Sequence, residues 1–271
     1  MQGRLSDQID GRIQFFPWND WEKEFFVAAS IGIHLMEWTL DHERIYENPL
    51  LTIEGRNLIK KLCNRFHISI PSLTGDCFMH APFWKCEHNE KNHLKTLFLE
   101  ICEVSAIIGI SKIVVPLVDN GRIQTNEQED EFLDFLLMNT ILFKKLRIQI
   151  IFESDHNPPE LKRFIKLLPK ETFGINYDIG NSASLGFNPI EEFSSYGERI
   201  KNVHVKDRLL GGTTVPLNKG AAKFRTVFRE LEKVKYNGNY ILQTARAIKG
   251  DHARVLSDYK NMTNLWIENN Y

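Results

Sequence analysis

The chain has 271 residues, of which 42% are hydrophobic and 11% aromatic, and its formal net charge is -1 at pH 7. The sequence pI is about 6.8, so the chain lacks the broad basic field that attracts duplex DNA or an anionic membrane surface. Its length fits one large α/β barrel or two modest domains, and its apolar content is enough for a substantial core.

The cysteines and the N-terminal segment bear on the cellular compartment. Cys63, Cys77, Cys86 and Cys102 form no CxxC pair and indicate reduced core thiols. The first ten residues, MQGRLSDQID, lack the apolar stretch of a secretion signal, and no apolar run approaches the roughly 20 residues that span a bilayer. We therefore expect a cytoplasmic protein without a membrane partner.

Short apolar, β-branched runs alternate with longer amphipathic segments along the chain, which favours a parallel sheet covered by helices. The expected strands are residues 3–5, 32–38, 69–73, 112–117, 148–153, 174–178, 202–205 and 240–243. The expected helices are residues 21–31, 53–66, 92–108, 129–145, 159–168, 224–235 and 251–267.

Eight strands in about 250 residues match the usual size of a closed (β/α)₈ barrel. We therefore expect an α/β fold in which a single TIM-barrel domain spans residues 1–271, with the active site at the C-terminal ends of the strands. A doubly wound open sheet is the alternative. Against it, no GxGxxG or GxxxxGK[ST] motif follows the first strand, and no linker rich in Pro, Gly or Ser divides the chain.

Polar residues stand at the ends of the later expected strands. The runs end as IIFE at Glu153, INYD at Asp178, NVHV with His204 and YILQ at Gln243. Two carboxylates, an imidazole and an amide oxygen suit one divalent cation such as Mn²⁺, Zn²⁺, Mg²⁺ or Co²⁺. A cation would also supply the charge that Glu153 needs at the end of an apolar strand. Each residue alone fits a structural role, but their equivalent positions favour a shared site.

The chain resembles the xylose isomerase-like TIM-barrel superfamily of sugar and sugar-phosphate isomerases and epimerases. The resemblance runs in order through QGRL, FPWNDWEKEFFVAASIGIHLMEW, HAPF, FES, NYDIGNSASLG, NVHVKDR, VPLNKGAAKF and YILQTAR. It implies a divalent metal held by Glu153, Asp178 and His204. Relatives place a second glutamate on the last strand, where this chain has Gln243.

The glutamine affects the expected chemistry. An amide oxygen can coordinate a metal but cannot accept a proton, so an epimerisation that uses two glutamate bases is excluded. We expect Glu153 to act as a single base on a sugar, keto-sugar or sugar phosphate. The second proton carrier is one of His80, His156, Lys206 or Asp207, or the metal moves the proton or hydride along another path. We take His80, which in FMHAPF matches a pocket histidine of the family, and Lys206 as the catalytic candidates beside Glu153.

Several residues are candidates for contacting the substrate. Glu37 matches a pocket acid of the family, whereas Trp38 is a candidate pocket wall and His156 follows the strand that ends at Glu153. Lys206 and Arg246 are candidates for holding a phosphate or carboxylate group, because barrels often bind phosphate after the seventh and eighth strands. The expected partner is a small-molecule sugar or sugar phosphate, and a homo-oligomer is left open.

Three other functions compete. A metal-dependent lyase or dehydratase on a keto-polyol needs only one base, and a catalytically silent sugar-binding relative is compatible with Gln243. AP endonucleases share the fold, but Asn181 stands where they place a histidine, and no Asp-x-His follows VHVKD. The near-neutral charge argues further against nucleic acid as a partner.

Overall fold

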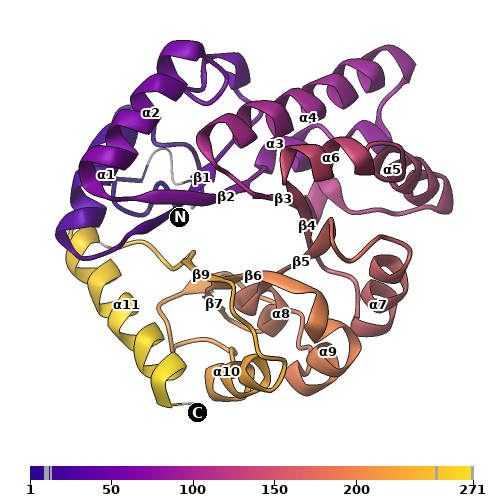
Figure 1. Ribbon diagram of the computed structural model, residues 1–271. Helices are drawn as coiled ribbons and strands as arrows, with labels where there is room; N and C mark the ends of the chain where they lie inside the picture. Colours follow the sequence, from indigo (N-terminus) through magenta and orange to yellow (C-terminus); the bar gives the residue numbers. More distant parts are fainter. Residues whose placement is uncertain (9–11, 13, 248–249, 270–271) are drawn as a thin grey trace. The chain divides into compact units, whose positions relative to one another are not determined.

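The computed structural model describes residues 1–8, 12, 14–247 and 250–269 (Figure 1). Two compact units divide the chain. The terminal unit comprises Met1–Ile33, Asp155–Ile165 and Ile175–Tyr271, and the middle unit comprises His34–Ser154 and Lys166–Gly174. The single domain expected over residues 1–271 stays a prediction.

The middle unit is built on a parallel sheet with strand order β1-β2-β3-β4 (Figure 1). Its strands are β1 (Leu35–Thr39), β2 (Ser69–Thr74), β3 (Lys112–Leu117) and β4 (Gln149–Ser154). Its α-helices are α2 (Ile53–Phe66), α3 (Asp76–His80), α4 (His88–Ile108), α5 (Asn126–Met138) and α6 (Thr140–Leu146). Its 3₁₀ turns are Ile45–Glu47, Phe83–Lys85 and Asp119–Gly121. Residues of β3 and β4 are buried on both faces, as in parallel sheets covered by helices.

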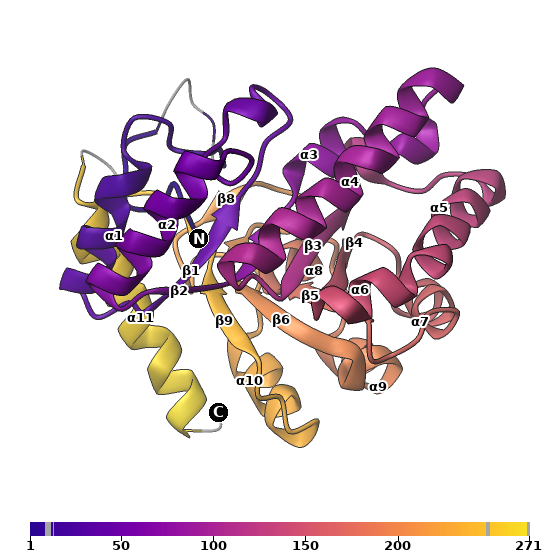
Figure 2. The same cartoon turned by 45° about the horizontal axis from the view of Figure 1, so that its top comes forward.

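The terminal unit carries the parallel strands β6 (Ile200–Val205) and β9 (Asn239–Leu242) and, from Ile175 on, β5 (Phe173–Asp178), in the order β5-β6-β9. An antiparallel pair, β7 (Asp207–Arg208) and β8 (Thr214–Val215), follows β6. The helices are α1 (Trp21–Ser30), α7 (Pro158–Lys166), α8 (Ile179–Ser184), α9 (Pro189–Tyr196), α10 (Phe224–Lys233) and α11 (His252–Asn269), with a 3₁₀ turn at Gly197–Arg199. Helix α10 packs against α9 and α11 (Figure 2).

Seven of the eight expected strands form among the described residues, and the expected strand at residues 3–5 is wrong. Gly3 has φ of 76°, a left-handed conformation that cannot continue a strand. The backbone N–H groups of Gly3 and Leu5 donate instead to the buried carboxylate of Glu24 in α1, at 2.9 and 3.0 Å. A side chain therefore satisfies the donors that a neighbouring strand would have bound.

The expected helix over residues 129–145 is two helices, α5 and α6, that meet at Asn139. The Asn139 amide donates to the Phe135 carbonyl at 2.8 Å, which satisfies a carbonyl at the end of α5. Several helix starts follow their capping signals. Thr52 and Thr125 accept the N–H groups of Gly55 and Gln128, respectively.

Aromatic packing supports the strand that ends at Glu153. Phe152 is fully buried, and its ring centroid lies 5.8 Å from that of Phe132 and 6.4 Å from that of Phe173. Phe132 lies 5.7 Å from Phe83 within the same aromatic cluster. Buried aromatic rings dominate core energetics, so the last residues of β4 are fixed by a well-packed neighbour.

Among the described residues, no helix combines the length and apolarity needed to cross a membrane.

Candidate metal centre

Strand register in the terminal unit brings the polar residues of β5, β6 and β9 into rows. Asp178 pairs with His204, and His204 pairs with Ile241. Gln243 follows β9, and its backbone N–H donates to the Val205 carbonyl at 3.1 Å, which continues the pairing. Side chains two residues apart share a face of a sheet. Gln243 therefore shares the face of Asp178 and His204, one step nearer the C-terminal end.

Asp178 is buried and uses its two carboxylate oxygens differently. Oδ1 accepts the Asn181 N–H at 2.8 Å and so caps helix α8, which begins directly after the strand. Oδ2 lies 3.2 Å from Lys206 Nζ and 3.9 Å from His204 Nδ1. The cap fixes the carboxylate, and its second oxygen faces the imidazole.

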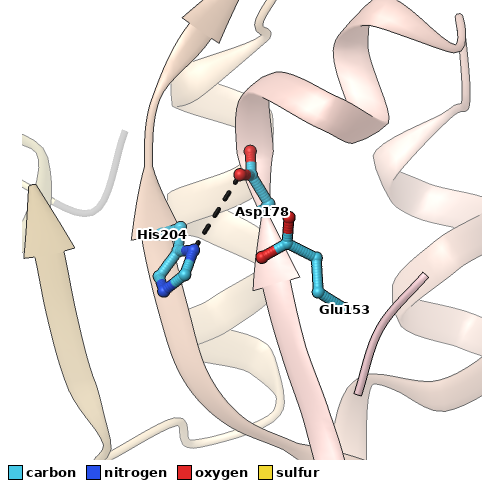
Figure 3. Close-up of side chains that lie close together, drawn as sticks. All are labelled: Glu153, Asp178 and His204. Carbon is cyan, nitrogen blue, oxygen red and sulfur yellow. Dashed lines mark ion pairs between the residues drawn. The ribbon is translucent and has the colours of Figure 1, made fainter. Parts of the chain in front are cut away.

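Glu153 completes the group that the strand ends predicted. Glu153, Asp178 and His204 are all buried, and each offers one ligand atom within 4.8 Å of the others (Figure 3). The Asp178 carboxylate and the His204 ring turn toward each other, with the Glu153 carboxylate beside them. Ligands about 2.1 Å from a common ion lie at most about 4.2 Å apart. Small side-chain adjustments would therefore let all three contact one cation.

The donor chemistry fits a divalent cation. Two carboxylates and one imidazole form a set that Mn²⁺ and Zn²⁺ both accept. The Gln243 side chain is also available, because its Nε2 donates to Gln14 Oε1 while its own Oε1 is buried and has no hydrogen-bond partner among the described residues. A buried amide oxygen without a partner costs about 1–3 kcal/mol. Coordination to a cation would remove that cost.

Two cationic side chains meet at Asn181, the residue whose backbone N–H binds Asp178. Lys206 Nζ donates to Asp178 Oδ2 and also to Asn181 Oδ1, at 3.2 and 3.1 Å. Arg208 Nη1 donates to the same Asn181 oxygen at 2.9 Å, and its Nε and Nη2 donate to the Gly212 carbonyl. The roles of Asn181 and Arg208 were not predicted from the sequence. The two-residue spacing of side chains along a strand could have identified Arg208, since Lys206 and Arg208 follow His204 at steps of two residues.

Asp207, a candidate proton carrier, lies between these cations in sequence but is fully buried. Its carboxylate accepts the backbone N–H groups of Lys219, Gly220 and Ala222, at 3.1, 2.8 and 3.1 Å. These bonds hold the VPLNKGAAKF loop against β7. Gly220 is required there, because a Cβ would lie 2.2 Å from Asp207 Oδ1.

The candidate residues of the middle unit lie in different environments. Glu37 is fully buried, and its Oε2 accepts the Ser72 hydroxyl at 2.7 Å. Trp38 points to the opposite face of β1, is fully buried, and donates its indole N–H to Asn48 Oδ1 at 3.1 Å. This burial gives Trp38 a packing role. His80 ends α3 with an exposed side chain.

The remaining candidates belong to the terminal unit. His156 Nδ1 lies 3.7 Å from Glu160 Oε2. Arg246 lies against the N-terminal segment, where its Nη1 donates to the Ser6 carbonyl at 3.0 Å and its guanidinium lies 4.6 Å from the Phe15 ring centroid. Burial lowers the pKa of Arg246 to about 10, so the group stays charged at neutral pH. These contacts show Arg246 holding the N-terminal segment.

A cavity of about 270 Å³ lies on the face of β5 that Tyr177 occupies, opposite to the face of Asp178. It is lined by residues that include Tyr177, Ser182, Phe187, Leu210 and Val227. Beside it, the buried Glu192 carboxylate accepts the hydroxyls of Tyr177, Ser182 and Tyr196, at 2.9, 2.6 and 2.8 Å. Burial raises the pKa of Glu192, although the three hydroxyls oppose this shift. Tyr177 and Asp178 point to opposite faces of the strand, so this cluster is separate from the metal-ligand candidates.

Comparison with known proteins identifies the family. Residues 25–259 match the family model described as xylose isomerase-like TIM barrel. The Escherichia coli (strain K12) protein named "Putative L-ribulose-5-phosphate 3-epimerase SgbU" is 20% identical over 238 residues, which cover 82% of this chain and 83% of that protein.

Solved structures of sugar epimerases share the fold. A D-psicose 3-epimerase structure determined in the presence of D-fructose gives a TM-score of 0.74 at 12% identity, covering 91% of this chain and 93% of that one. An L-ribulose 3-epimerase structure gives 0.74 at 11% identity, covering 92% and 89%. The expected TIM-barrel fold is therefore confirmed, and the chain belongs to the xylose isomerase-like TIM barrel family.

Proposed function

We propose that this protein is a divalent-metal-dependent isomerase or epimerase that acts on a sugar, keto-sugar or sugar phosphate. The observation that carries the proposal is the convergence of Glu153, Asp178 and His204, whose ligand atoms lie within 4.8 Å of one another. The names of the relatives, which are sugar and sugar-phosphate epimerases, support the substrate class.

Glu153, Asp178 and His204 would hold the cation, and Gln243 would add its unpaired amide oxygen as a fourth ligand. When bound, Mn²⁺, Zn²⁺, Mg²⁺ or Co²⁺ would act as a Lewis acid that polarises a substrate carbonyl. The cap at Asn181 holds Asp178 in place for this role. The hydrogen bond from Gln14 restrains the Gln243 side chain.

Glu153 is the proposed base for a proton next to the substrate carbonyl, because Gln243 cannot accept a proton. One base suffices for isomerisation when the proton leaves and returns on a single face of an enediol. Lys206 is the proposed second proton carrier, since its ammonium group lies 3.2 Å from the Asp178 carboxylate. His80 remains a further proposed proton carrier, and Glu37, Trp38 and His156 remain proposed substrate contacts.

Lys206 and Arg208 support a substrate with an anionic group. Both donate to Asn181 Oδ1, so two positive charges lie together there, and Lys206 also contacts Asp178. Lys206 and Arg208 already balance the charges of the two carboxylate ligands, so a bound divalent cation would give the site a net positive charge. The excess of positive charge favours a phosphate or carboxylate on the substrate. Arg246 also remains a proposed contact, although its observed contacts are with Ser6 and Phe15.

The test is deuterium exchange from D₂O into a panel of ketoses, uronates and ketose phosphates, followed by NMR with metal-free and Mn²⁺-loaded protein. We expect exchange only in the loaded protein, and a loss of at least about 100-fold in Glu153→Gln. Glu171→Gln is the matched control, because Glu171 is exposed and precedes β5. Exchange that persists in Glu153→Gln would place the base elsewhere.

Two other results would identify the competing functions. Loss of water from the substrate, with no isomer formed, would indicate a metal-dependent dehydratase, for which the single base is also sufficient. A protein that binds the sugars but takes up no Mn²⁺ would indicate a silent sugar-binding relative. Either result would contradict the proposed isomerase or epimerase activity.

A further inference from the structure

A row of asparagines lies directly beneath the candidate ligands in the terminal unit. Asn176 pairs with Asn202, and Asn202 pairs with Asn239. Asn176 and Asn202 precede Asp178 and His204 by two residues, so they share the same face of the sheet. They are 2% and 0% exposed. Asparagine is depleted in strands, so two buried amides in successive strands call for a specific hydrogen-bonding role.

The direction of the hydrogen bonds fixes the orientation of the Asn176 amide. Asn202 Nδ2 donates to Asn176 Oδ1 at 2.8 Å. The oxygen of Asn176 therefore faces Asn202, and its Nδ2 faces His204 Nδ1 at 3.1 Å. An amide NH₂ group can only donate. His204 Nδ1 must then accept, so it carries a lone pair, and the proton of the neutral ring resides on Nε2.

The same ring nitrogen faces the candidate metal centre. Nδ1 lies 3.9 Å from Asp178 Oδ2, and Figure 3 shows it turned toward that carboxylate. A histidine ligand needs an unprotonated nitrogen directed at the metal. Asp178 alone would favour the wrong tautomer, because a carboxylate accepts hydrogen bonds and would draw a proton onto Nδ1. The Asn176 amide opposes that preference.

We infer that Asn176, oriented by Asn202, is a positioning residue that sets the tautomer of His204 and keeps Nδ1 available to a metal. The inference rests on the proposed function insofar as it concerns the metal. Nδ1 has one lone pair, which the amide and a cation cannot share. The amide thus occupies the nitrogen in the metal-free protein and excludes a proton from it.

The first test reads the tautomer of His204 by ¹⁵N NMR of the metal-free protein, at a pH where the ring is neutral. The His204→Asn variant identifies the signals of this ring. We expect unprotonated Nδ1 and protonated Nε2 in the wild type. In Asn176→Asp, a carboxylate replaces the amide donor, so we expect the proton to move to Nδ1. Asn239→Leu is the control, because Asn239 pairs with Asn202 and not with Asn176.

The second test measures Mn²⁺ affinity by calorimetry. In Asn176→Leu, which removes the donor and keeps a similar volume, the Asp178 carboxylate would draw the ring proton onto Nδ1, and this charge-assisted hydrogen bond must break before a cation binds. We therefore expect Mn²⁺ binding to weaken about 10- to 100-fold. Asn202→Leu should weaken it less, since Asn202 acts through Asn176. Asn239→Leu should bind as the wild type does. Circular dichroism and thermal unfolding check that each variant is folded.

The outcomes separate this inference from the proposed function. Protonated Nδ1 in the wild type, or unchanged Mn²⁺ affinity in a folded Asn176→Leu, would overturn the inference. The expected tautomer in a protein that binds no metal would overturn the proposed function and leave the positioning role of Asn176 standing. If the Asn176 variants fail to fold, the wild-type spectrum alone decides the tautomer.

Discussion

Replacing Gln243 with glutamate tests the fourth position of the proposed metal centre. In the wild type, Gln243 donates from Nε2 to Gln14 Oε1, and its own buried oxygen has no hydrogen-bond partner among the described residues. Glutamate removes that donor and sets a carboxylate oxygen against the Gln14 oxygen. It also adds a negative charge on the face that holds Asp178. We expect the metal-free variant to be less stable and the metal-loaded variant to gain more from its cation.

The magnitude follows from the lost contact. Loss of one partner of a buried hydrogen bond costs about 1–3 kcal/mol. For a chain of this size, 1 kcal/mol corresponds to about 2 °C in Tm, so we expect a decrease of about 2–6 °C without metal. Free Mn²⁺ at 100 times its Kd contributes about 2.7 kcal/mol to the wild type. Tenfold tighter binding in the variant would add about 1.4 kcal/mol at the same concentration.

Thermal unfolding with and without Mn²⁺ measures both effects. Gln149→Glu is the matched control, because the Gln149 side chain also donates to a carbonyl, at 3.0 Å from Glu171 O, but lies at the start of β4. We expect Mn²⁺ to stabilise this control as much as the wild type. Equal Mn²⁺-induced shifts in Gln243→Glu and the wild type would refute a place for Gln243 at the metal. Epimerase activity on ketose phosphates that already exists in the wild type and is equal in the variant would refute the single-base argument.

Three further substitutions test the surroundings of the site. Burial raises the pKa of Glu192 above its ordinary 4.5, so the stability that this group contributes is full below pH 4.5 and is lost as pH rises through the raised pKa. In urea unfolding, the free energy of unfolding of Glu192→Gln relative to the wild type should therefore rise over this pH range. A constant difference between the two proteins across the range would refute this. Asp207→Asn should cost about 2–3 kcal/mol and speed amide exchange at Ala222, because the single amide oxygen can keep the Lys219 and Gly220 donors, which share Oδ2, while the Ala222 donor loses its acceptor. In Gly180→Ala, the new Cβ would lie 2.7 Å from Lys206 Cγ. We therefore expect the free energy of unfolding to fall by about 1–3 kcal/mol and substrate turnover to weaken. An unchanged Tm would show that Lys206 moves freely.

Sequence periodicity was reliable where local rules decide the outcome. The run that ends at Glu153 forms a strand because its apolar, β-branched residues pack against buried aromatic rings such as Phe132. Period-two alternation also placed Asp178 and His204 on one face, since register pairs them directly. The same rule would have identified Asn176 from the repeated spacing Asn-x-Asp and Asn-x-His in neighbouring strands.

Local rules failed where residues distant in sequence compete for the same groups. The segment at residues 3–5 has the composition of a strand, but Glu24 captures its backbone donors. Arg246 follows the last strand, and its hydrogen bond to Ser6, 240 residues away, could not be predicted from its place after that strand. Such contacts depend on how elements pack, and hydrophobic periodicity carries no information about them.

The sequence by itself determined the alternation of strands and helices and the chemistry at the strand ends, because side-chain alternation and helix signals act over a few residues. Only the tertiary structure decided which oxygen of Asp178 faces His204, which amide sets the tautomer of that ring, and which cations meet at Asn181. Those relations depend on strand register and on angstrom-scale distances between residues more than 20 positions apart, which close packing fixes.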